Sequence, residues 1–146
     1  MSSHPGFEAE AEAEQKKLTE MLNQKSPFPV MYMRDSLAKI MKENLGIVRN
    51  EANLDQGIES VDYDLSVADR IRYDGSISVY TYYSLIGILT IARAVLTCAK
   101  ARKESRGAHY RSDYPESAED YRYATLISYD DGNYHVSYDR EKAYEN

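Results

Sequence analysis

A long apolar segment with a basic end constrains this chain more than any other feature. Residues 79–99 are almost entirely apolar or small, and three cations follow within four positions: Lys100, Arg102 and Lys103. Cations at the end of a helix complement the partial negative charge of its last carbonyl groups. The pattern therefore predicts one long helix over residues 76–106. Because this helix is apolar on all sides, we expect other helices to surround it.

Three further helices are expected before the long one. Apolar residues recur at helical spacing over residues 7–24, 30–45 and 51–71. Asn50 precedes the third helix and is expected to cap its first turn. Gly57 lies inside that helix and should weaken it by about 1 kcal/mol relative to Ala.

The second half of the chain changes from helical to strand periodicity. Gly107 is expected to end the long helix in the left-handed conformation, and Pro115 keeps the helix from resuming. Residues 124–129 and 134–138 then alternate as two short strands. The turn-forming segment 130–133 between them predicts a β-hairpin.

These elements together predict a mainly α fold. We expect an antiparallel helical bundle of three to four helices with one long central helix, and a small C-terminal β-hairpin. Residues 1–111 form the bundle, and residues 112–146 form a loop and hairpin tail packed on it. At 146 residues the chain is long enough for one domain with a real core.

The charge is unevenly distributed along the chain. The formal net charge is −6, which argues against a nucleic-acid partner. Residues 93–111 carry six cations against one acid, a balance of +5, whereas residues 112–146 carry nine acids against three cations, a balance of −6. Such a layout suits a protein contact. The single thiol, Cys98, excludes an intrachain disulfide and fits a reducing cytosol.

Targeting signals are not evident in this sequence. The first residues lack the basic and apolar regions of a secretory signal. Residues 79–99 reach the length of about 20 residues that a membrane span needs. Arg93 and several Ser and Thr residues weaken that interpretation, and we expect a buried core helix with no membrane span.

The sequence offers little for catalysis. It has no glycine-rich dinucleotide or phosphate loop, no His-Glu-x-x-His and no paired cysteines, so flavin, nucleotide and metal sites lack local support. Among the three histidines, His4 lies near the terminus, and His135 alternates in a strand as a half-exposed residue. His109 is the one serious candidate for chemistry.

Two interpretations of His109 are open. With Glu104, Arg106, Arg111 and Asp113 nearby, it could act as a general acid or base, since histidine is easily poised near neutral pH. Alternatively, the arginines and His109 donate to the unpaired carbonyls of the helix end. The structural or docking role is favoured, because the segment shows neither a nucleophile nor a cofactor site.

The same segment resembles a known family. Ser105-Arg106-Gly107-Ala108-His109, followed by Arg111, Asp113 and Pro115, is similar to the helix-to-loop segment of the succinate dehydrogenase and fumarate reductase flavoprotein subunits. Gly46-Ile47-Val48-Arg49 resembles the Gly-Ile-Phe-Arg of that family, with Val48 in place of Phe. The family's early Glu and Asn of the long helix appear here as Ser84 and Gly87. The similarity spans about residues 15–140.

The C-terminal residues distinguish between two branches of this superfamily. L-Aspartate oxidases share Glu104-Ser105-Arg106-Gly107 and Asp113-Tyr114-Pro115, but their chains tend to finish soon afterwards. Residues 125–129 and 134–138 resemble the strand pair near the end of the succinate dehydrogenase and fumarate reductase flavoproteins. The resemblance therefore favours the fumarate reductase and succinate dehydrogenase branch.

The resemblance implies a scaffold domain of an oxidoreductase. In this family an upstream domain binds FAD, and no catalytic, cofactor or metal residue of the family maps onto these positions. The implied partners are that flavin-binding domain and an iron-sulfur subunit, with the protein cytoplasmic or peripheral at the inner face of the membrane through its partner subunits. Five residues are candidates for a structural or interface role: Arg106, Gly107, His109, Arg111 and Asp113. The alternatives are an L-aspartate oxidase domain and a free-standing helical interaction module.

Overall fold

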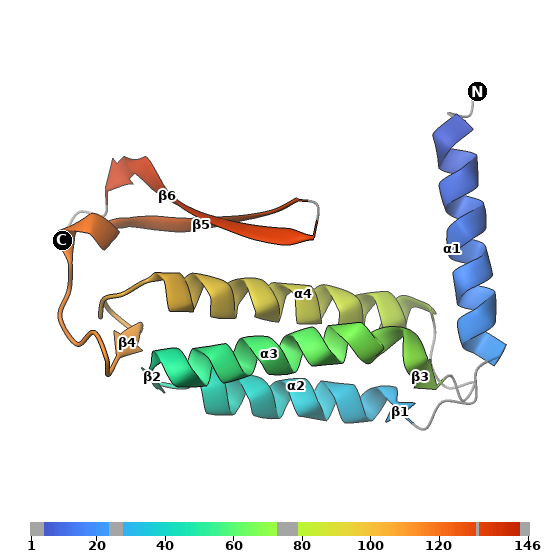
Figure 1. Ribbon diagram of the computed structural model, residues 1–146, viewed down its shortest axis with the longest axis horizontal. Coiled ribbons are helices and arrows are strands. Elements are labelled where there is room, and N and C mark those ends of the chain that lie inside the picture. The colour runs from blue at the N-terminus through green and yellow to red at the C-terminus, as the bar shows by residue number, and fades with distance from the viewer. Residues whose placement is uncertain (1–4, 24–27, 73–78, 131, 144–146) are drawn as a thin grey trace.

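Three helices lie side by side in this protein, with a β-hairpin along one of them and a fourth helix standing at one end (Figure 1). The computed structural model describes residues 5–23, 28–72, 79–130 and 132–143. Four helices and a C-terminal antiparallel hairpin confirm the mainly α prediction. Along the chain, the second, third and fourth helices change direction at each connection (Figure 1).

The helices and strands follow the order of the sequence pattern. The helices are α1 (Pro5–Asn23), α2 (Val30–Asn44), α3 (Glu51–Val67) and α4 (Val79–Ala101). Short strands are β1 (Phe28–Pro29), β2 (Val48–Arg49), β3 (Ile71–Arg72) and β4 (Tyr110–Arg111). The hairpin consists of β5 (Tyr123–Asp130) and β6 (Asn133–Ala143).

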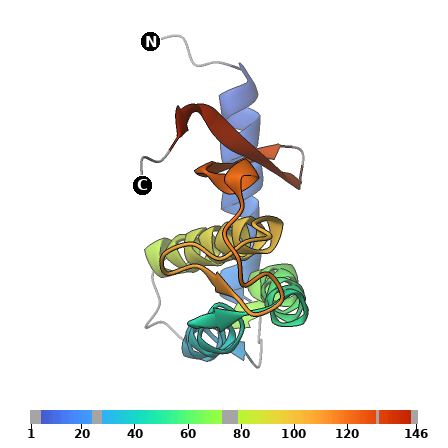
Figure 2. The same cartoon turned by 90° about the vertical axis from the view of Figure 1, so that its left-hand side faces the viewer.

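The core lies between α2, α3 and α4. Each helix contributes residues three, four or seven positions apart, so that one stripe faces inward. The buried apolar side chains are Met33, Leu37, Ile40, Leu54, Val61, Ala68, Tyr82, Leu85, Leu89, Ala92, Leu96 and Ala99. Figure 2 shows the three helices end-on as a triangle, with the hairpin on the α4 side.

Gly57 allows the three core helices to approach closely. A methyl group at this position would lie 2.8 Å from Asn44 Cβ on α2 and 3.0 Å from Leu96 Cδ2 on α4. Such distances are too short for carbon atoms, so any side chain would push the helices apart. The glycine that weakens the helix by propensity is therefore required by packing.

Helix α4 is not surrounded by the other elements, and that expectation was wrong. Its inner stripe is buried, but Ile88, Ile91 and Val95 are 52%, 64% and 41% exposed. Over Tyr80–Ala101 the helix is long and apolar enough to cross a membrane by length and composition, yet only 28% of the window is buried. The reason is that α2 and α3 cover one side of α4 and the hairpin another, which leaves a third side open.

Helix α1 stands apart from the layer of helices instead of joining it (Figure 1). Its apolar residues Phe7 and Ala11 are exposed and Leu18 is half-buried, and no described residue of α1 belongs to the buried core. It contacts β3, and two side-chain contacts reach α4: Tyr83 Oη donates to Glu14, and Lys17 Nζ lies 5.9 Å from the Tyr82 ring centroid.

Two predicted helix ends are corrected. The third helix was expected to reach Ile71, but α3 ends at Val67; a 3-10 turn over Ala68–Arg70 follows, and the chain then becomes extended where β3 pairs in parallel with β1. The long helix was expected to reach Arg106, but α4 ends at Ala101. Its expected start behind Ser76 lies outside the described residues. The predicted cap Asn50 is confirmed, since its side chain accepts from Asn53 N at 2.8 Å.

The hairpin lies along α4 and is anchored by tyrosines and one arginine. Tyr134 Oη donates to Thr90 O at 3.4 Å, and Tyr138 Oη donates to Ala101 O at 3.3 Å. The Arg93 guanidinium lies 5.2 Å from the Tyr134 ring centroid. Both strands extend beyond their predicted limits, because the pairing continues from Asp130 to Tyr123.

Candidate functional site

Two segments that are about 60 residues apart in the sequence meet at one end of the molecule. Strands β2 and β4 pair in parallel, which places Val48 beside Tyr110 and Arg49 beside Arg111. Residues 46–51 and 102–118 are called the junction below. The junction contains all five residues that the sequence analysis selected, and it closes the ends of α3 and α4.

Arg111 is fully buried and occupies the C-terminal end of α4. Its Nη1 donates to the carbonyl oxygens of Ala99 and Lys100, each at 3.1 Å, and to that of Arg102 at 3.3 Å. Helix ends leave their last carbonyls without partners, and a cation there also interacts favourably with the helix dipole. The guanidinium therefore replaces the continuation of the helix, which is why α4 stops at Ala101.

Asp113 joins Arg111 to the start of α3. Its carboxylate accepts from Arg111 Nε and Nη2, both at 2.7 Å, and from Glu51 N at 2.9 Å. The hydrogen bonds from Arg111 hold the pKa of Asp113 well below its usual range. One ion pair thus joins the negative end of α4 to the positive end of α3.

Glu104 is a fully buried acid between two arginines. It accepts from Arg102 Nη2, from Arg106 Nε at 3.2 Å and from Ala118 N at 2.9 Å. Burial acts to raise the pKa of Glu104, but these hydrogen bonds outweigh it and the pKa lies below its ordinary value. The carboxylate remains charged and ties three parts of the loop together.

His109 has a partner at each ring nitrogen. Its Nδ1 lies 2.8 Å from Arg49 Nη1, which can only donate, so Nδ1 accepts. Its Nε2 lies 3.3 Å from Arg102 O and carries the proton. Burial, together with the charges of Arg49, Arg102 and Arg111, lowers the pKa of His109. The ring is therefore neutral near pH 7, in the Nε2-protonated tautomer.

Gly107 forms a tight turn and does not stop the helix. Its φ is 56°, the left-handed value that was expected. The turn lies between Arg106 and His109, whose backbone groups exchange hydrogen bonds of 2.8 and 2.9 Å, five positions beyond the end of α4. The glycine thus presents His109 to Arg49.

The roles of two junction residues were not predicted from the sequence. Arg49 was noted only as part of a motif, yet it orients His109 and donates through Nε to Gly46 O at 3.0 Å. Glu104 was named as a neighbour of His109 and as the one acid of a basic segment, but its full burial was not predicted. The alternation Arg102-x-Glu104-x-Arg106 was the signal that could have revealed the cluster.

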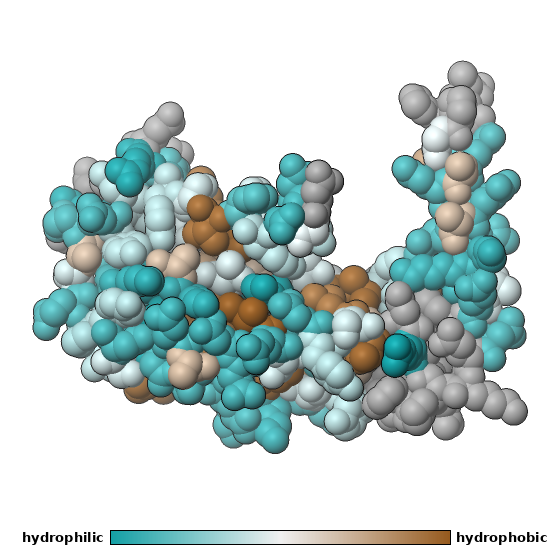
Figure 3. All heavy atoms as spheres, in the orientation of Figure 1, coloured by the Kyte–Doolittle hydropathy of each residue, from teal (hydrophilic) through white to brown (hydrophobic). Residues whose placement is uncertain are grey.

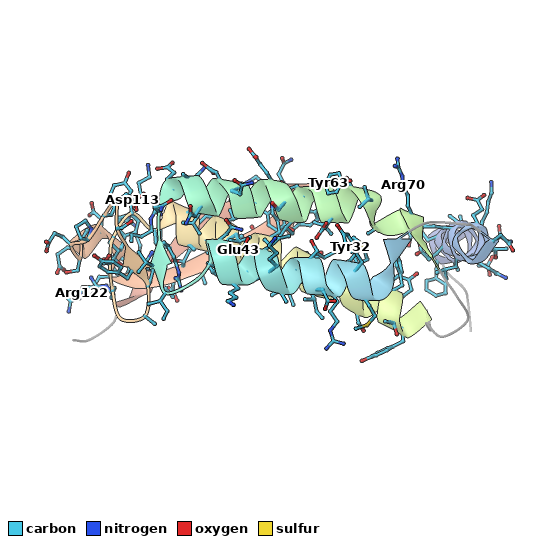
Figure 4. All side chains as sticks on the ribbon, turned by 90° about the horizontal axis from the view of Figure 1, so that it is seen from below. Tyr32, Glu43, Tyr63, Arg70, Asp113 and Arg122 are labelled. Atoms are coloured by element: carbon cyan, nitrogen blue, oxygen red, sulfur yellow. The ribbon has the colours of Figure 1, made fainter. Side chains whose placement is uncertain are left out.

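A second feature is a groove of about 790 Å3 between α2 and α3, called the α2–α3 groove below. Its ionisable side chains other than tyrosine are Lys39, Glu43, Glu59 and Asp64. Figure 4 shows Tyr32 and Tyr63 on the two opposite helices near one end of this groove. A flavin dinucleotide does not fit it, because acidic side chains outnumber the single lysine and a pyrophosphate is anionic. Within the described residues, no group of three or more metal-ligating side chains gathers at one point.

Comparison with known proteins assigns the family. The family described as "Fumarate reductase flavoprotein C-term" matches residues 34–145, which include most of α2, all of α3 and α4, the junction and the hairpin. The chain belongs to this family. The match confirms the resemblance that the motifs of the junction indicated.

Individual relatives agree with the family match. An uncharacterised FAD-dependent oxidoreductase of Methanocaldococcus jannaschii is 33% identical over 87% of this chain and 24% of its own length. L-Aspartate oxidase of Pyrococcus furiosus is 34% identical over 64% of this chain and 16% of its own length. The E. coli quinol fumarate reductase FrdA structure superposes with a TM-score of 0.74 at 27% identity, over 94% of this chain and 25% of that chain.

The chain therefore spans about a quarter or less of the length of these relatives. The family assignment rests on the C-terminal part of the flavoproteins, and both the fumarate reductase and the L-aspartate oxidase branches are represented. The family profile is described as fumarate reductase and extends through the hairpin to residue 145, which fits the fumarate reductase branch best.

Proposed function

We propose that this chain acts as the C-terminal scaffold domain of a fumarate reductase or succinate dehydrogenase flavoprotein subunit. In this proposal α2, α3 and α4 form an antiparallel bundle that packs on the flavin-binding domain and helps to form the surface that meets an iron-sulfur subunit. The domain serves fumarate and succinate oxidoreduction without supplying a catalytic, cofactor or metal residue. Its location is cytoplasmic, peripheral to the membrane through partner subunits.

The open side of α4 is the observation that carries the proposal. Ile88, Ile91 and Val95, called the open face below, lie three and four residues apart and are exposed although the opposite side of the helix forms the core. Figure 3 shows further hydrophobic atoms in separate patches along the middle of one face of the molecule. A contiguous exposed apolar surface on a soluble domain is typical of a protein contact.

The length of the relatives indicates which partner to expect for the open face. The FAD-dependent oxidoreductase of M. jannaschii is about four times as long as the part that matches this chain. The flavin-binding region is therefore expected in the part of the relatives that this chain does not match, and we propose that it covers the open face. The five junction residues Arg106, Gly107, His109, Arg111 and Asp113 are proposed to hold the loop and the domain contact.

The test is co-purification of the tagged chain with a flavoprotein from its native cells. We expect about one flavin per chain in the complex and none on the chain alone after gel filtration. Ile91→Glu should abolish the association, since it places a charge in an apolar contact. Met31→Glu, at an exposed apolar residue of α2, is the matched control and should leave it intact.

The outcomes separate the alternatives. Flavin that stays with the isolated chain would overturn the scaffold role. Association with an L-aspartate oxidase flavoprotein would place the domain in that branch, which the P. furiosus relative represents. Association with a protein that holds no flavin would favour a free-standing interaction module.

A further inference from the structure

The α2–α3 groove contains two buried acceptor atoms that receive no hydrogen bond from the described residues. Asp64 is 5% exposed; its Oδ2 accepts from Ser36 Oγ at 3.0 Å, and its Oδ1 receives no hydrogen bond from the described residues. Asn44 is 8% exposed; its Nδ2 donates to Ile40 O at 3.0 Å, and its Oδ1 has no donor in the described part of the chain. Both side chains line the groove. Buried polar atoms normally have hydrogen-bond partners, so we expect the groove to bind a ligand that donates hydrogen bonds.

The charge of the groove favours a cation. Three acids line it, Glu43, Glu59 and Asp64, against Lys39 alone, which gives a balance of −2. Burial raises the pKa of Asp64 by removing the carboxylate from water, and the opposing effect of the hydrogen bond from Ser36 is smaller. A positively charged donor placed in the groove would satisfy both the charge and the hydrogen-bonding capacity.

The aromatic rim distinguishes a guanidinium from an ammonium. Tyr32 on α2 and Tyr63 on α3 line the same groove and are 60% and 62% exposed (Figure 4). A planar guanidinium stacks on aromatic rings and presents five N–H donors, whereas an ammonium presents three donors and remains more strongly hydrated. The groove therefore matches arginine better than lysine.

The shape of the groove favours a polypeptide over a small molecule. Its lining residues run from Tyr32 to Asn44 along α2, a rise of about 18 Å at 1.5 Å per residue. An extended chain covers that length with about five residues. Sites for small ligands enclose most of the ligand surface, but both tyrosines here are more than half exposed.

We propose that the α2–α3 groove binds an arginine side chain presented on an extended segment of another domain or protein. The guanidinium lies between Tyr32 and Tyr63 and donates to Asp64. This site is separate from the open face of α4, because α2 and α3 lie in front of α4 when the groove faces the viewer (Figure 4). Its test is independent of the flavoprotein assembly.

The experiment is a nuclear magnetic resonance titration of the full 146-residue chain. The probe is a capped pentapeptide with arginine between pairs of alanines, and its control carries citrulline, which has the same shape without the charge. We expect the arginine peptide to shift amide signals of α2 and α3 along the groove and the citrulline peptide to leave them unchanged. Agmatine, a free guanidinium compound, should bind more weakly than the peptide.

Variants locate the contact. Asp64→Asn should weaken binding about tenfold, equivalent to about 1.4 kcal/mol. Asp62→Asn lies two residues away on α3, pairs with Arg93 at 2.6 Å and should change binding less than about twofold, a surface effect. If Asp64→Asn fails to fold, Tyr63→Ala at an exposed position should still weaken binding about threefold through the lost ring.

Several results would overturn the proposal. Equal binding of the citrulline peptide would remove the role of charge, and signal shifts outside α2 and α3 would remove the groove. Agmatine that binds as tightly as the peptide would show a small-molecule site. Unchanged affinity in Asp64→Asn, with the fold intact, would show that the carboxylate takes no part.

Discussion

The junction and the open face of α4 belong to the same helix, yet one is completed within this chain and the other is not. At the junction, Arg111 and Asp113 connect two helix ends, and Glu104 holds two arginines. Along the open face, Ile88 and Ile91 lie more than half exposed. The comparison indicates that the polar contacts of the junction stabilise the fold of this domain, whereas the apolar open face is available for contact with a partner.

Removing the Arg111 side chain should have the largest effect on stability. A small effect would contradict the view that the junction stabilises the fold of this domain. Arg111→Ala removes the guanidinium from the Asp113 carboxylate and from the carbonyl oxygens of Ala99, Lys100 and Arg102. Loss of one partner of a buried ion pair costs about 3–5 kcal/mol, so the urea midpoint should fall sharply. Arg34→Ala, an exposed arginine on α2, is the control and should change stability by less than about 0.5 kcal/mol.

The two sides of α4 should respond differently to the same kind of truncation. Leu89→Ala removes a fully buried side chain and should cost about 2–5 kcal/mol through lost burial and a cavity. Ile91→Ala, two residues away and mostly exposed, should cost less than about 0.5 kcal/mol in the isolated chain. Equal costs in denaturant unfolding would show that the open face is covered within this chain.

Gly57 lies where α2, α3 and α4 approach closely, so its substitution tests how tightly the core is packed. Gly57→Ala raises helix propensity, but its methyl group would meet Asn44 Cβ and Leu96 Cδ2. We expect a net loss of about 1–3 kcal/mol from overpacking. A thermal midpoint above that of the parent would show that propensity outweighs packing here.

The junction should also carry a small dependence on pH. The pKa of His109 is lowered in the folded state, so the unfolded chain binds more protons on the acid side of about pH 6.5. The contribution is therefore present above that pH and is lost as the pH falls. His109→Gln should flatten the fall in stability between about pH 7 and pH 5. An unchanged slope in chemical unfolding at several pH values would contradict the assignment.

The sequence predicted the local elements well because their signals are local. Met33, Leu37 and Ile40 mark the inner face of α2 by spacing alone, and residues 130–133 mark the hairpin turn. The candidate residues of the junction were found by a motif within eleven positions. Their contact with Arg49 was missed, because 60 residues separate it from His109.

The open face could not be predicted, for a different reason. An apolar helix such as residues 79–99 has the same composition whether its own chain or another chain covers it. The end of α4 was missed because Arg111, ten residues after Ala101, satisfies the helix carbonyls in place of a further turn. Propensity describes neither effect, since both depend on segments that meet only after folding.

Turnover of the flavoprotein assembled with this chain tests the central claim most directly. We propose that the junction is a scaffold, in which both nitrogens of His109 already have hydrogen-bond partners. His109→Ala should lower assembly or stability by about 1–3 kcal/mol, as loss of a buried hydrogen-bond partner does. Fumarate reduction per assembled flavin should stay close to that of the parent. A loss of about a hundredfold or more, with flavin content and folding intact, would make His109 an acid-base catalyst and contradict the account.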